Sequence, residues 1–183
     1  MESLIELDKV IFIFLNSLGS ESFDSLWLII TDKKSSVPIY ICLIYVMYKK
    51  LSKKEFLKYL ILIIILIILT DQTSGFFKNF FQRLRPCHDE DINSLIRIVK
   101  EGCGGLYGFF SAHAANTFAV ATFFYFTLKK YSSRFNLLFL WAFIVSYSRI
   151  YIGVHFPIDI LIGAFFGTSL GYFFSFYSNK ISL

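Results

Sequence analysis

Long apolar runs separated by short charged connections limit what this 183-residue chain can fold into more than any other feature. In one run, residues 60–69 are all leucine or isoleucine. Within a bilayer every backbone polar group needs a partner inside the protein, and a helix provides one for nearly every group. With 56% apolar and 17% charged residues, the composition agrees with burial in lipid. We therefore predict an all-α integral membrane protein with a single domain over residues 1–183.

Five of the apolar runs are predicted to cross the membrane as helices of one polytopic bundle. They are residues 37–48, 56–77, 111–128, 135–152 and 157–177. A transmembrane helix needs roughly 20 apolar residues, so the first run is expected to extend at its ends.

In the N-terminal segment, residues 4–18, apolar residues recur at helical spacing and oppose polar side chains. This pattern fits an amphipathic helix that lies in the membrane interface better than a full span. Residues 19–24 interrupt it before a second short interfacial piece at residues 26–31. A six-span alternative, in which residues 4–31 cross the membrane once, stays open. Acidic residues come first and no small-residue cleavage site follows, so no cleavable signal peptide is expected.

Charge in the short connections predicts the orientation of the bundle. Residues 49–58 and 129–134 are almost purely basic, with Glu55 as the single acid, and Lys180 falls on the same side. By the positive-inside rule these segments are cytoplasmic. We expect the chain in a bacterial inner membrane, with all three histidines at the periplasmic or outer face. The net charge of +5 is explained by these connections, so no nucleic-acid partner is expected.

The turn between the last two runs, residues 148–159, carries the clearest functional signal. Arg149, His155 and Asp159 lie there within eleven positions. A charged side chain at the bilayer centre costs about 2.5 to 3.5 kcal/mol, so such residues usually line a polar site. If a helix begins near Phe156, the Asp159 carboxylate lies one turn from His155 and accepts its Nδ1 proton, which leaves Nε2 free as a nucleophile. An interfacial arginine and an ordinary loop histidine stay open as the alternative.

Further cations and a helix start fall on the same predicted face. They are Lys78 and Arg85 at the end of the second run, and Ser111, Ala112 and His113 at the start of the third. A helix N-terminus presents free N–H groups to an anion, and arginines hold phosphoryl oxygens with two parallel hydrogen bonds. With one histidine to attack and another to protonate a leaving oxygen, the predicted reaction is phosphoryl transfer to water through a phosphohistidine.

Three segments of this region resemble the signature motifs of the type 2 phosphatidic acid phosphatase superfamily. They are residues 78–86 (KNFFQRLRP), residues 110–113 (FSAH) and residues 148–159 (SRIYIGVHFPID). The middle segment departs from the family pattern, with Phe110 in place of the usual proline and Ala112 in place of the usual glycine. The resemblance implies a core of six bundled helices and a lipid phosphatase that needs neither a metal nor a cofactor.

The resemblance also implies a role for each matching residue. His155 corresponds to the nucleophile, Asp159 to the residue that orients it, and His113 to the general acid for the leaving group. The phosphate-binding residues correspond to Lys78, Arg85, Ser111 and Arg149, with the backbone N–H of Ala112 as an addition. Residues 88–91 have metal-ligand side chains but are interpreted as a solvated loop, because consecutive loop residues rarely complete one coordination shell.

The expected substrate is a phosphate monoester or diphosphate on a membrane lipid headgroup. Small members of the superfamily that this chain resembles favour lipid A 1-phosphate or undecaprenyl diphosphate, and phosphatidylglycerophosphate and phosphatidate are further candidates. A lipid transporter or scramblase that uses the basic mouth as a headgroup site is the alternative function. The sequence leaves open whether Cys87 and Cys103 form a disulfide and how many chains assemble.

Overall fold

The computed structural model describes residues 2–100 and 102–178, so the predicted cytoplasmic Lys180 lies outside the described residues. Seven α-helices account for most of this part of the chain. They are α1 (Glu2–Ser17), α2 (Glu21–Thr31), α3 (Val37–Lys50), α4 (Lys53–Phe81), α5 (Ala112–Leu128), α6 (Leu137–Tyr151) and α7 (Pro157–Ser178). Short 3₁₀ helices precede α3 and α6, at Lys33–Ser36 and Ser133–Asn136, and two more lie in the long loop after α4, at Pro86–His88 and Asn93–Leu95.

All five predicted membrane runs coincide with helices, and side-chain caps define the starts of α4 and α5. α4 starts at Lys53 because Ser52 and Glu55 form a reciprocal capping box at its N-terminus. It continues to Phe81, so Lys78 lies in the last turn of the helix and not in the loop that follows.

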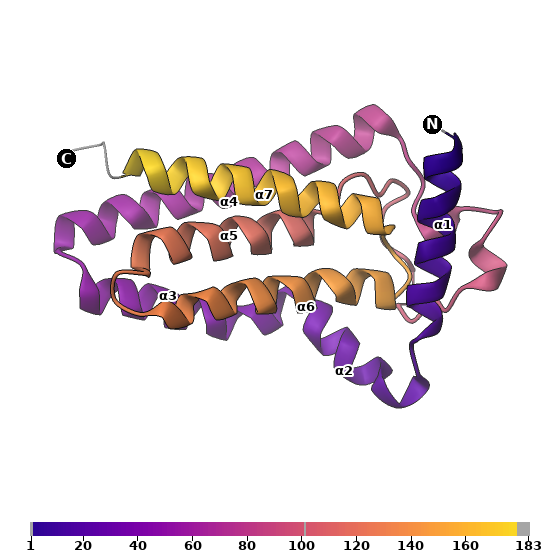
Figure 1. The fold of residues 1–183 in the computed structure, drawn as a ribbon, viewed down its shortest axis with the longest axis horizontal. Helices are drawn as coiled ribbons and strands as arrows, with labels where there is room; N and C mark the ends of the chain where they lie inside the picture. The colour runs from indigo at the N-terminus through magenta and orange to yellow at the C-terminus, as the bar shows by residue number, and fades with distance from the viewer. Residues whose placement is uncertain (1, 101, 179–183) are drawn as a thin grey trace.

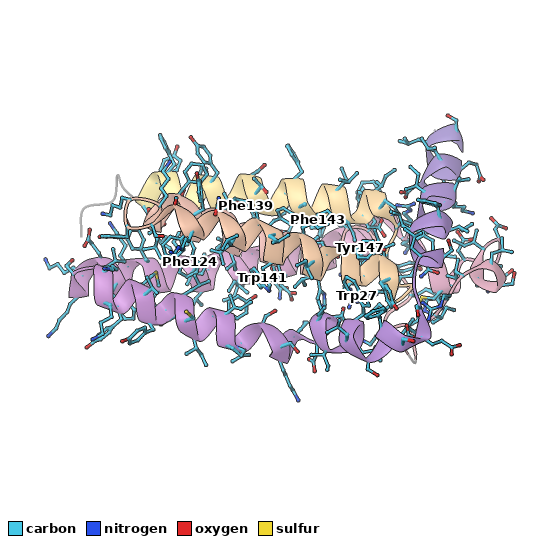
Figure 2. The ribbon with its side chains drawn as sticks, turned by 60° about the horizontal axis from the view of Figure 1, so that its bottom comes forward. Trp27, Phe124, Phe139, Trp141, Phe143 and Tyr147 are labelled. Carbon is cyan, nitrogen blue, oxygen red and sulfur yellow. A yellow bond between two sulfur atoms is a disulfide. The ribbon has the colours of Figure 1, made fainter. Side chains whose placement is uncertain are left out.

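α2 starts earlier than the sequence predicted. The chain turns only at residues 18–20, because acidic side chains occupy the first turn of α2 from Glu21 onward, where the helix dipole favours negative charge. Trp27 then packs α2 against α6 (Figure 2). Its ring stacks on Tyr151 at 4.9 Å between centroids and lies edge-on to Tyr147 at 5.2 Å. This contact brings the end of α2 close to the end of α6.

α3 to α7 run along the long axis of the bundle, and α1 crosses one end of it (Figure 1). α5 is the central helix, because it packs against α4, α6 and α7, most extensively against α7. Most of its side chains are buried, among them Val120, Phe123 and Phe124. The connections from α3 to α4 and from α5 to α6 lie at the end of the bundle opposite α1 (Figure 1).

Glycines on α7 let it approach α5 closely. Gly163, Gly167 and Gly171 recur every fourth residue, are buried and face α5. A Cβ built on Gly163 would lie 2.6 Å from the carbonyl oxygen of Ser111, and one on Gly167 would overlap the Ala115 carbonyl. Glycine at these three positions therefore permits close helix packing. The contact at Ser111 also fixes the start of α5 beside the first turns of α7.

α1 is an amphipathic helix that buries two polar side chains, those of Asp8 and Asn16, against the protein. Asp8, Phe12 and Asn16 are buried at every fourth residue, while Leu4 and Phe14 are 56% and 61% exposed. An outward apolar face on a helix that crosses the end of the bundle fits a place in the membrane interface. α1 and α2 are separate helices joined by a turn and do not form one continuous spanning helix.

Two helices, α4 with 29 residues and α7 with 22, are long and apolar enough to cross a membrane by length and composition. α3, α5 and α6 have 14, 17 and 15 residues, so five spans stay a prediction. Large apolar side chains face outward along the bundle, and those of Ile64 and Phe165 are 50% and 73% exposed. Apolar exposure of this extent is expected against lipid and is rare against water.

The variant Gly167→Leu is expected to destabilise the contact between α5 and α7. Its side chain would collide with the Ala115 backbone, and overpacking of this kind costs about 1 to 3 kcal/mol. Thermal unfolding of the detergent-purified variant, followed by circular dichroism, should give a lower Tm than wild type. Gly75→Ala is the matched control, because a Cβ at Gly75 of α4 meets nothing within 4 Å. Equal Tm values for Gly167→Leu and wild type would contradict this packing.

Candidate active site

The pair His155 and Asp159 lies where the chain enters α7. α7 begins at Pro157, so Asp159 falls in its first turn, and its Oδ2 accepts the backbone N–H of Phe156 at 3.1 Å. The same oxygen lies 3.3 Å from Nδ1 of His155. Both side chains are buried, with 2% of His155 and none of Asp159 exposed. The carboxylate therefore fixes the imidazole through Nδ1 and leaves Nε2 for chemistry, in the geometry that the spacing predicts.

The second oxygen of Asp159 is held by a guanidinium that sequence reasoning missed. Arg83 donates from Nη1 to Asp159 Oδ1 at 2.8 Å and from Nη2 to Asp8 Oδ2 at 2.5 Å. Asp8 lies on α1, and its other oxygen accepts the backbone N–H of Ile158 at 3.0 Å. The Arg83 guanidinium also lies 4.3 Å from the centroid of the Phe156 ring. α1, the loop after α4 and the start of α7 are thus tied together around one carboxylate.

Several cations surround His155. Burial of the imidazole, reinforced by the charges of Arg149, Arg85 and Lys78, holds the pKa of His155 well below its ordinary value. A neutral imidazole is a nucleophile and an imidazolium is not, so this environment keeps His155 in its reactive form at neutral pH. The same positive charges would attract and hold a phosphate beside the ring.

The returning part of the long loop holds Arg85. The backbone N–H of Arg85 donates to the Leu106 carbonyl at 3.1 Å, and its Nε donates to the Tyr107 carbonyl at 3.2 Å. The next residue, Gly108, is buried against the carboxylate, because a Cβ there would lie 3.1 Å from Asp159 Oδ2. A larger residue would crowd this contact, so the glycine allows the loop to bring Arg85 up to the site.

The start of α5 carries the predicted helix N-terminus. The backbone N–H of Ser111 donates to the main-chain carbonyl of Asp159 at 3.0 Å. Its hydroxyl is fully buried and caps the helix by accepting the N–H of Ala114 at 3.5 Å. His113 is half-buried, and its Nε2 lies 3.2 Å from the carbonyl oxygen of Thr31. Because a carbonyl only accepts, Nε2 of His113 carries the hydrogen in this arrangement.

Thr31, at the end of α2, is a second residue that sequence reasoning missed. Besides its carbonyl contact with His113, its hydroxyl accepts a hydrogen bond from Nη1 of Arg149 at 2.5 Å. Arg149 is only 4% exposed, and its buried Nε has no hydrogen-bond partner among residues 2–100 and 102–178. An unpaired buried donor on a charged group is costly, and a phosphoryl oxygen would satisfy it.

Two adjoining cavities meet at His113. One, of about 370 Å³, lies between α3, α4 and α5 and includes Tyr40, Asp71 and Ala112 in its lining. The other, of about 530 Å³, includes Lys100 and Arg149. Thr31, Asp32, Lys33 and His113 line both. His155 lines neither cavity, whereas His113 lines both and Arg149 lines the second.

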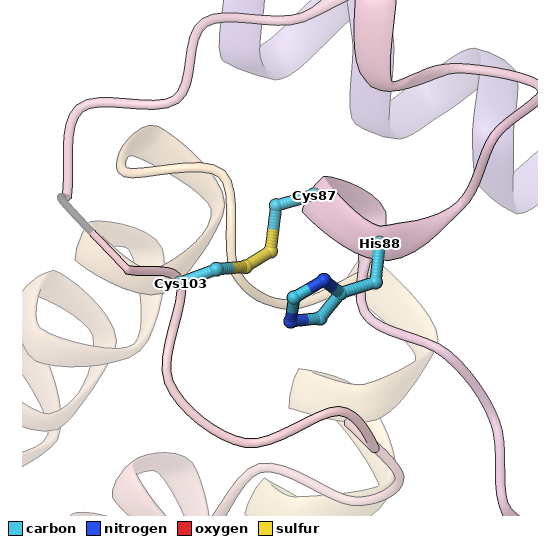
Figure 3. Close-up of side chains that lie close together, drawn as sticks. All are labelled: Cys87, His88 and Cys103. Atoms are coloured by element: carbon cyan, nitrogen blue, oxygen red, sulfur yellow. A yellow bond between two sulfur atoms is a disulfide. The ribbon is translucent and has the colours of Figure 1, made fainter.

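The long loop after α4 is closed by a disulfide between Cys87 and Cys103, the pairing that the sequence left open. His88 lies beside the two sulfur atoms (Figure 3). Because the sulfurs are bonded to each other, they are not thiolate ligands in this state. Glu90 and Asp91 of the predicted solvated run are exposed, and the run also contacts α1, where Lys9 pairs with Asp89 at 3.1 Å and with Asp91 at 2.7 Å.

Residues 56–182 match the PAP2 superfamily, and the chain belongs to this superfamily. Among curated proteins, it is 35% identical over 186 residues to the lipid A 4'-phosphatase of Bacteroides thetaiotaomicron, a match that covers 100% of this chain and 81% of that protein. It is 34% identical over 176 residues to the lipid A 4'-phosphatase of Porphyromonas gingivalis, with 94% and 73% covered.

Two solved structures share the fold. A transmembrane PAP2-type phosphatidylglycerolphosphate phosphatase from Bacillus subtilis superposes with a TM-score of 0.78 at 21% identity, over 100% of this chain and 89% of that one. LpxE of Aquifex aeolicus superposes with a TM-score of 0.63 at 25% identity, over 93% of each chain. Together with the curated relatives, these matches make the chain a membrane lipid phosphatase, which confirms the predicted family and enzyme class.

The variant Arg83→Gln is expected to lower kcat by about 10- to 100-fold, because charge-assisted hydrogen bonds of about 1.5 to 3 kcal/mol hold the Asp159 carboxylate. KM should change much less, since the Arg83 guanidinium already pairs with two carboxylates and is not expected to bind the substrate. Asp8→Asn should also lower kcat, but by a smaller factor than Arg83→Gln. The measurement is steady-state phosphate release from a lipid phosphate in detergent.

Lys9→Gln is the matched control, because it removes the two ion pairs of α1 with Asp89 and Asp91 without touching Asp159. A wild-type kcat for Arg83→Gln, or the same loss for Lys9→Gln, would contradict the positioning role of Arg83.

Proposed function

We propose that the chain removes the 4'-phosphate of lipid A through a phosphohistidine on His155. The observation that carries the proposal is the buried imidazole of His155, held by Asp159 and surrounded by Arg85, Arg149 and Lys78. The choice of substrate is supported by two lipid A 4'-phosphatases, because the matches to this chain cover 81% and 73% of their lengths. The 4'-phosphate of lipid A thus replaces lipid A 1-phosphate and undecaprenyl diphosphate as the favoured substrate. Those two lipids are tested as alternative substrates.

In the first step, Nε2 of neutral His155 attacks the phosphorus atom of the monoester. The bond between phosphorus and the sugar oxygen breaks, and the phosphoryl group passes to Nε2. His113 supplies the proton that the departing sugar oxygen needs, so the lipid leaves as an alcohol. In this role the sugar oxygen takes the place of the Thr31 carbonyl as the acceptor for the hydrogen on His113 Nε2.

In the second step, water attacks the phosphorus of the phosphohistidine while His113, now deprotonated, accepts a proton from that water. The bond from phosphorus to Nε2 breaks, inorganic phosphate leaves, and His155 returns to its neutral form. Lys78, Arg85 and Arg149 bind the phosphoryl oxygens in both steps, aided by Ser111 and the backbone N–H of Ala112. Cations already in place stabilise charge in the transition state without reorganisation.

The orientation proposed is five spans, α3 to α7, with α1 in the interface and the active site at the outer face of a bacterial inner membrane. The connections at residues 49–58 and 129–134 support it, because they are basic and lie at the end of the bundle opposite α1 (Figure 1). Asp8 of α1 contacts the site network, so the site lies at the α1 end.

The direct test is phosphate release by detergent-purified protein in the presence of a chelator. The substrates are lipid A with a 4'-phosphate alone, lipid A with a 1-phosphate alone, undecaprenyl diphosphate, phosphatidylglycerophosphate and phosphatidate. We expect the highest kcat/KM with the 4'-phosphate, no loss in chelator, and a loss of about a thousandfold or more in His155→Ala. Full activity in His155→Ala would contradict the mechanism, and preference for another lipid would contradict the substrate.

The rate of hydrolysis should follow a bell-shaped pH profile. Attack needs neutral His155, so the rate rises with pH as His155 loses its proton. Because burial and neighbouring cations hold the pKa of His155 well below 6.5, the acid limb should lie below pH 6.5. The alkaline limb arises when His113 loses the proton that the leaving group needs. An acid limb at or above pH 6.5, or a flat kcat from about pH 4 to 9, would contradict these roles.

A further inference from the structure

A group of lysines lies beside the proposed phosphate site, and the two proposed steps of hydrolysis assign no role to them. Lys33, Lys34 and Lys100, here called the basic rim, line the cavity of about 530 Å³ together with His113 and Arg149. We propose that the basic rim binds a second anionic group on the same lipid headgroup. The proposal rests on the proposed function, because it assumes that the first phosphate lies against Arg149 and His113.

The charge balance at this end of the protein sets the basic rim apart. The neighbouring cations Lys9, Arg83 and Arg97 are each paired with carboxylates, namely Asp89 and Asp91, Asp8 and Asp159, and Asp24. Within residues 2–100 and 102–178, the rim lysines make no ion pair with a carboxylate. The acidic residue in the cavity lining is Asp32, whose carboxylate accepts the backbone N–H of Lys34 at 3.0 Å.

Lys33 and Lys34 are held next to the proposed catalytic groups. They follow Thr31, which contacts both His113 and Arg149. Consecutive Cα atoms lie about 3.8 Å apart, so the Cα of Lys33 lies within about 7.6 Å of the Cα of Thr31. The Asp32 cap fixes the start of the 3₁₀ helix that carries both lysines. An anion bound by these side chains is therefore close enough to Arg149 to belong to the same molecule as a phosphate bound there.

Lys100 comes from the long loop and is fixed on both sides. Three residues before it, the backbone N–H of Arg97 donates to Asn16 Oδ1 at 2.7 Å, and the Asn16 amide donates back to the Arg97 carbonyl at 3.1 Å. Three residues after it, Cys103 is joined to Cys87 by the disulfide. The loop thus holds Lys100 at the cavity that Lys33 also lines.

The chemistry of the rim selects the ligand. Partial burial and the charges of Arg149 and Arg85 lower the pKa of Lys100, and a bound anion would relieve this repulsion. Lysine ammonium groups act as point charges that accept either phosphate or carboxylate oxygens. The second group is thus a phosphate monoester or a sugar carboxylate on the headgroup that carries the reacting phosphate. A headgroup with a single phosphate leaves the rim empty, which gives the enzyme a preference for doubly anionic glycolipids.

The test compares the triple variant Lys33→Gln/Lys34→Gln/Lys100→Gln with wild type in uncharged detergent micelles. The substrates are a disaccharide lipid with the reacting phosphate alone, with a second phosphate, and with an added acidic sugar. We expect KM to rise about tenfold for a doubly anionic substrate, since exposed charge pairs contribute a few-fold each. KM for the singly phosphorylated lipid should stay within about twofold, and kcat should be unchanged. The doubly anionic lipid that responds identifies the second group.

The control is Lys49→Gln/Lys50→Gln/Lys53→Gln, which removes the same charge at the opposite end of the bundle. An equal rise of KM for all three lipids, or no rise for any, would overturn the proposal. Equilibrium binding of the same lipids in a His155→Ala background separates it from the hydrolytic function. If wild type releases no phosphate, the proposed function fails, while a loss of binding confined to doubly anionic lipids in the rim variant still supports the subsite.

Discussion

The carboxylate of Asp159 is the group on which the active-site geometry depends. One oxygen accepts the Phe156 N–H and faces His155, and the other accepts from Arg83. The main-chain carbonyl of the same residue accepts the N–H of Ser111, which begins the turn into α5. A single residue in the first turn of α7 therefore joins the three motif segments, and through Arg83 and Asp8 it also joins α1.

Burying these charges costs free energy, and ion pairing offsets only part of that cost. Asp8 and Asp159 are balanced by Arg83, but the charges of Arg149, Arg85 and Lys78 still act together on His155. A buried charge is tolerated when it is paired and hydrogen-bonded. The surplus of positive charge favours an anion at this site, and so does the Nε of Arg149, which has no hydrogen-bond partner in the part of the chain that the structure describes. In the proposed mechanism, a bound phosphate would neutralise this surplus.

Most of the helices could be predicted from the sequence because each apolar run is long, and at the start of α4 the cap formed by Ser52 and Glu55 is also local. The pair His155 and Asp159 could be predicted because its geometry depends only on a spacing of four residues. Arg83, Asp8 and Thr31 could not, because their contacts join residues far apart in the chain. The separation is 75 residues between Arg83 and Asp8, and 118 between Arg149 and Thr31. Helical periodicity indicated that α1 is amphipathic, but only packing decides that Asp8 faces the site.

The most direct test of the account is to trap the covalent intermediate. Wild-type protein would be mixed with lipid A labelled at its 4'-phosphate, quenched in alkali within milliseconds, and mapped by peptide mass spectrometry. The account predicts a phosphorylated imidazole at residue 155, at no more than one per chain, and no label in His155→Ala. Label on another side chain, or turnover with no phosphorylated protein at any time, would contradict the central role assigned to His155.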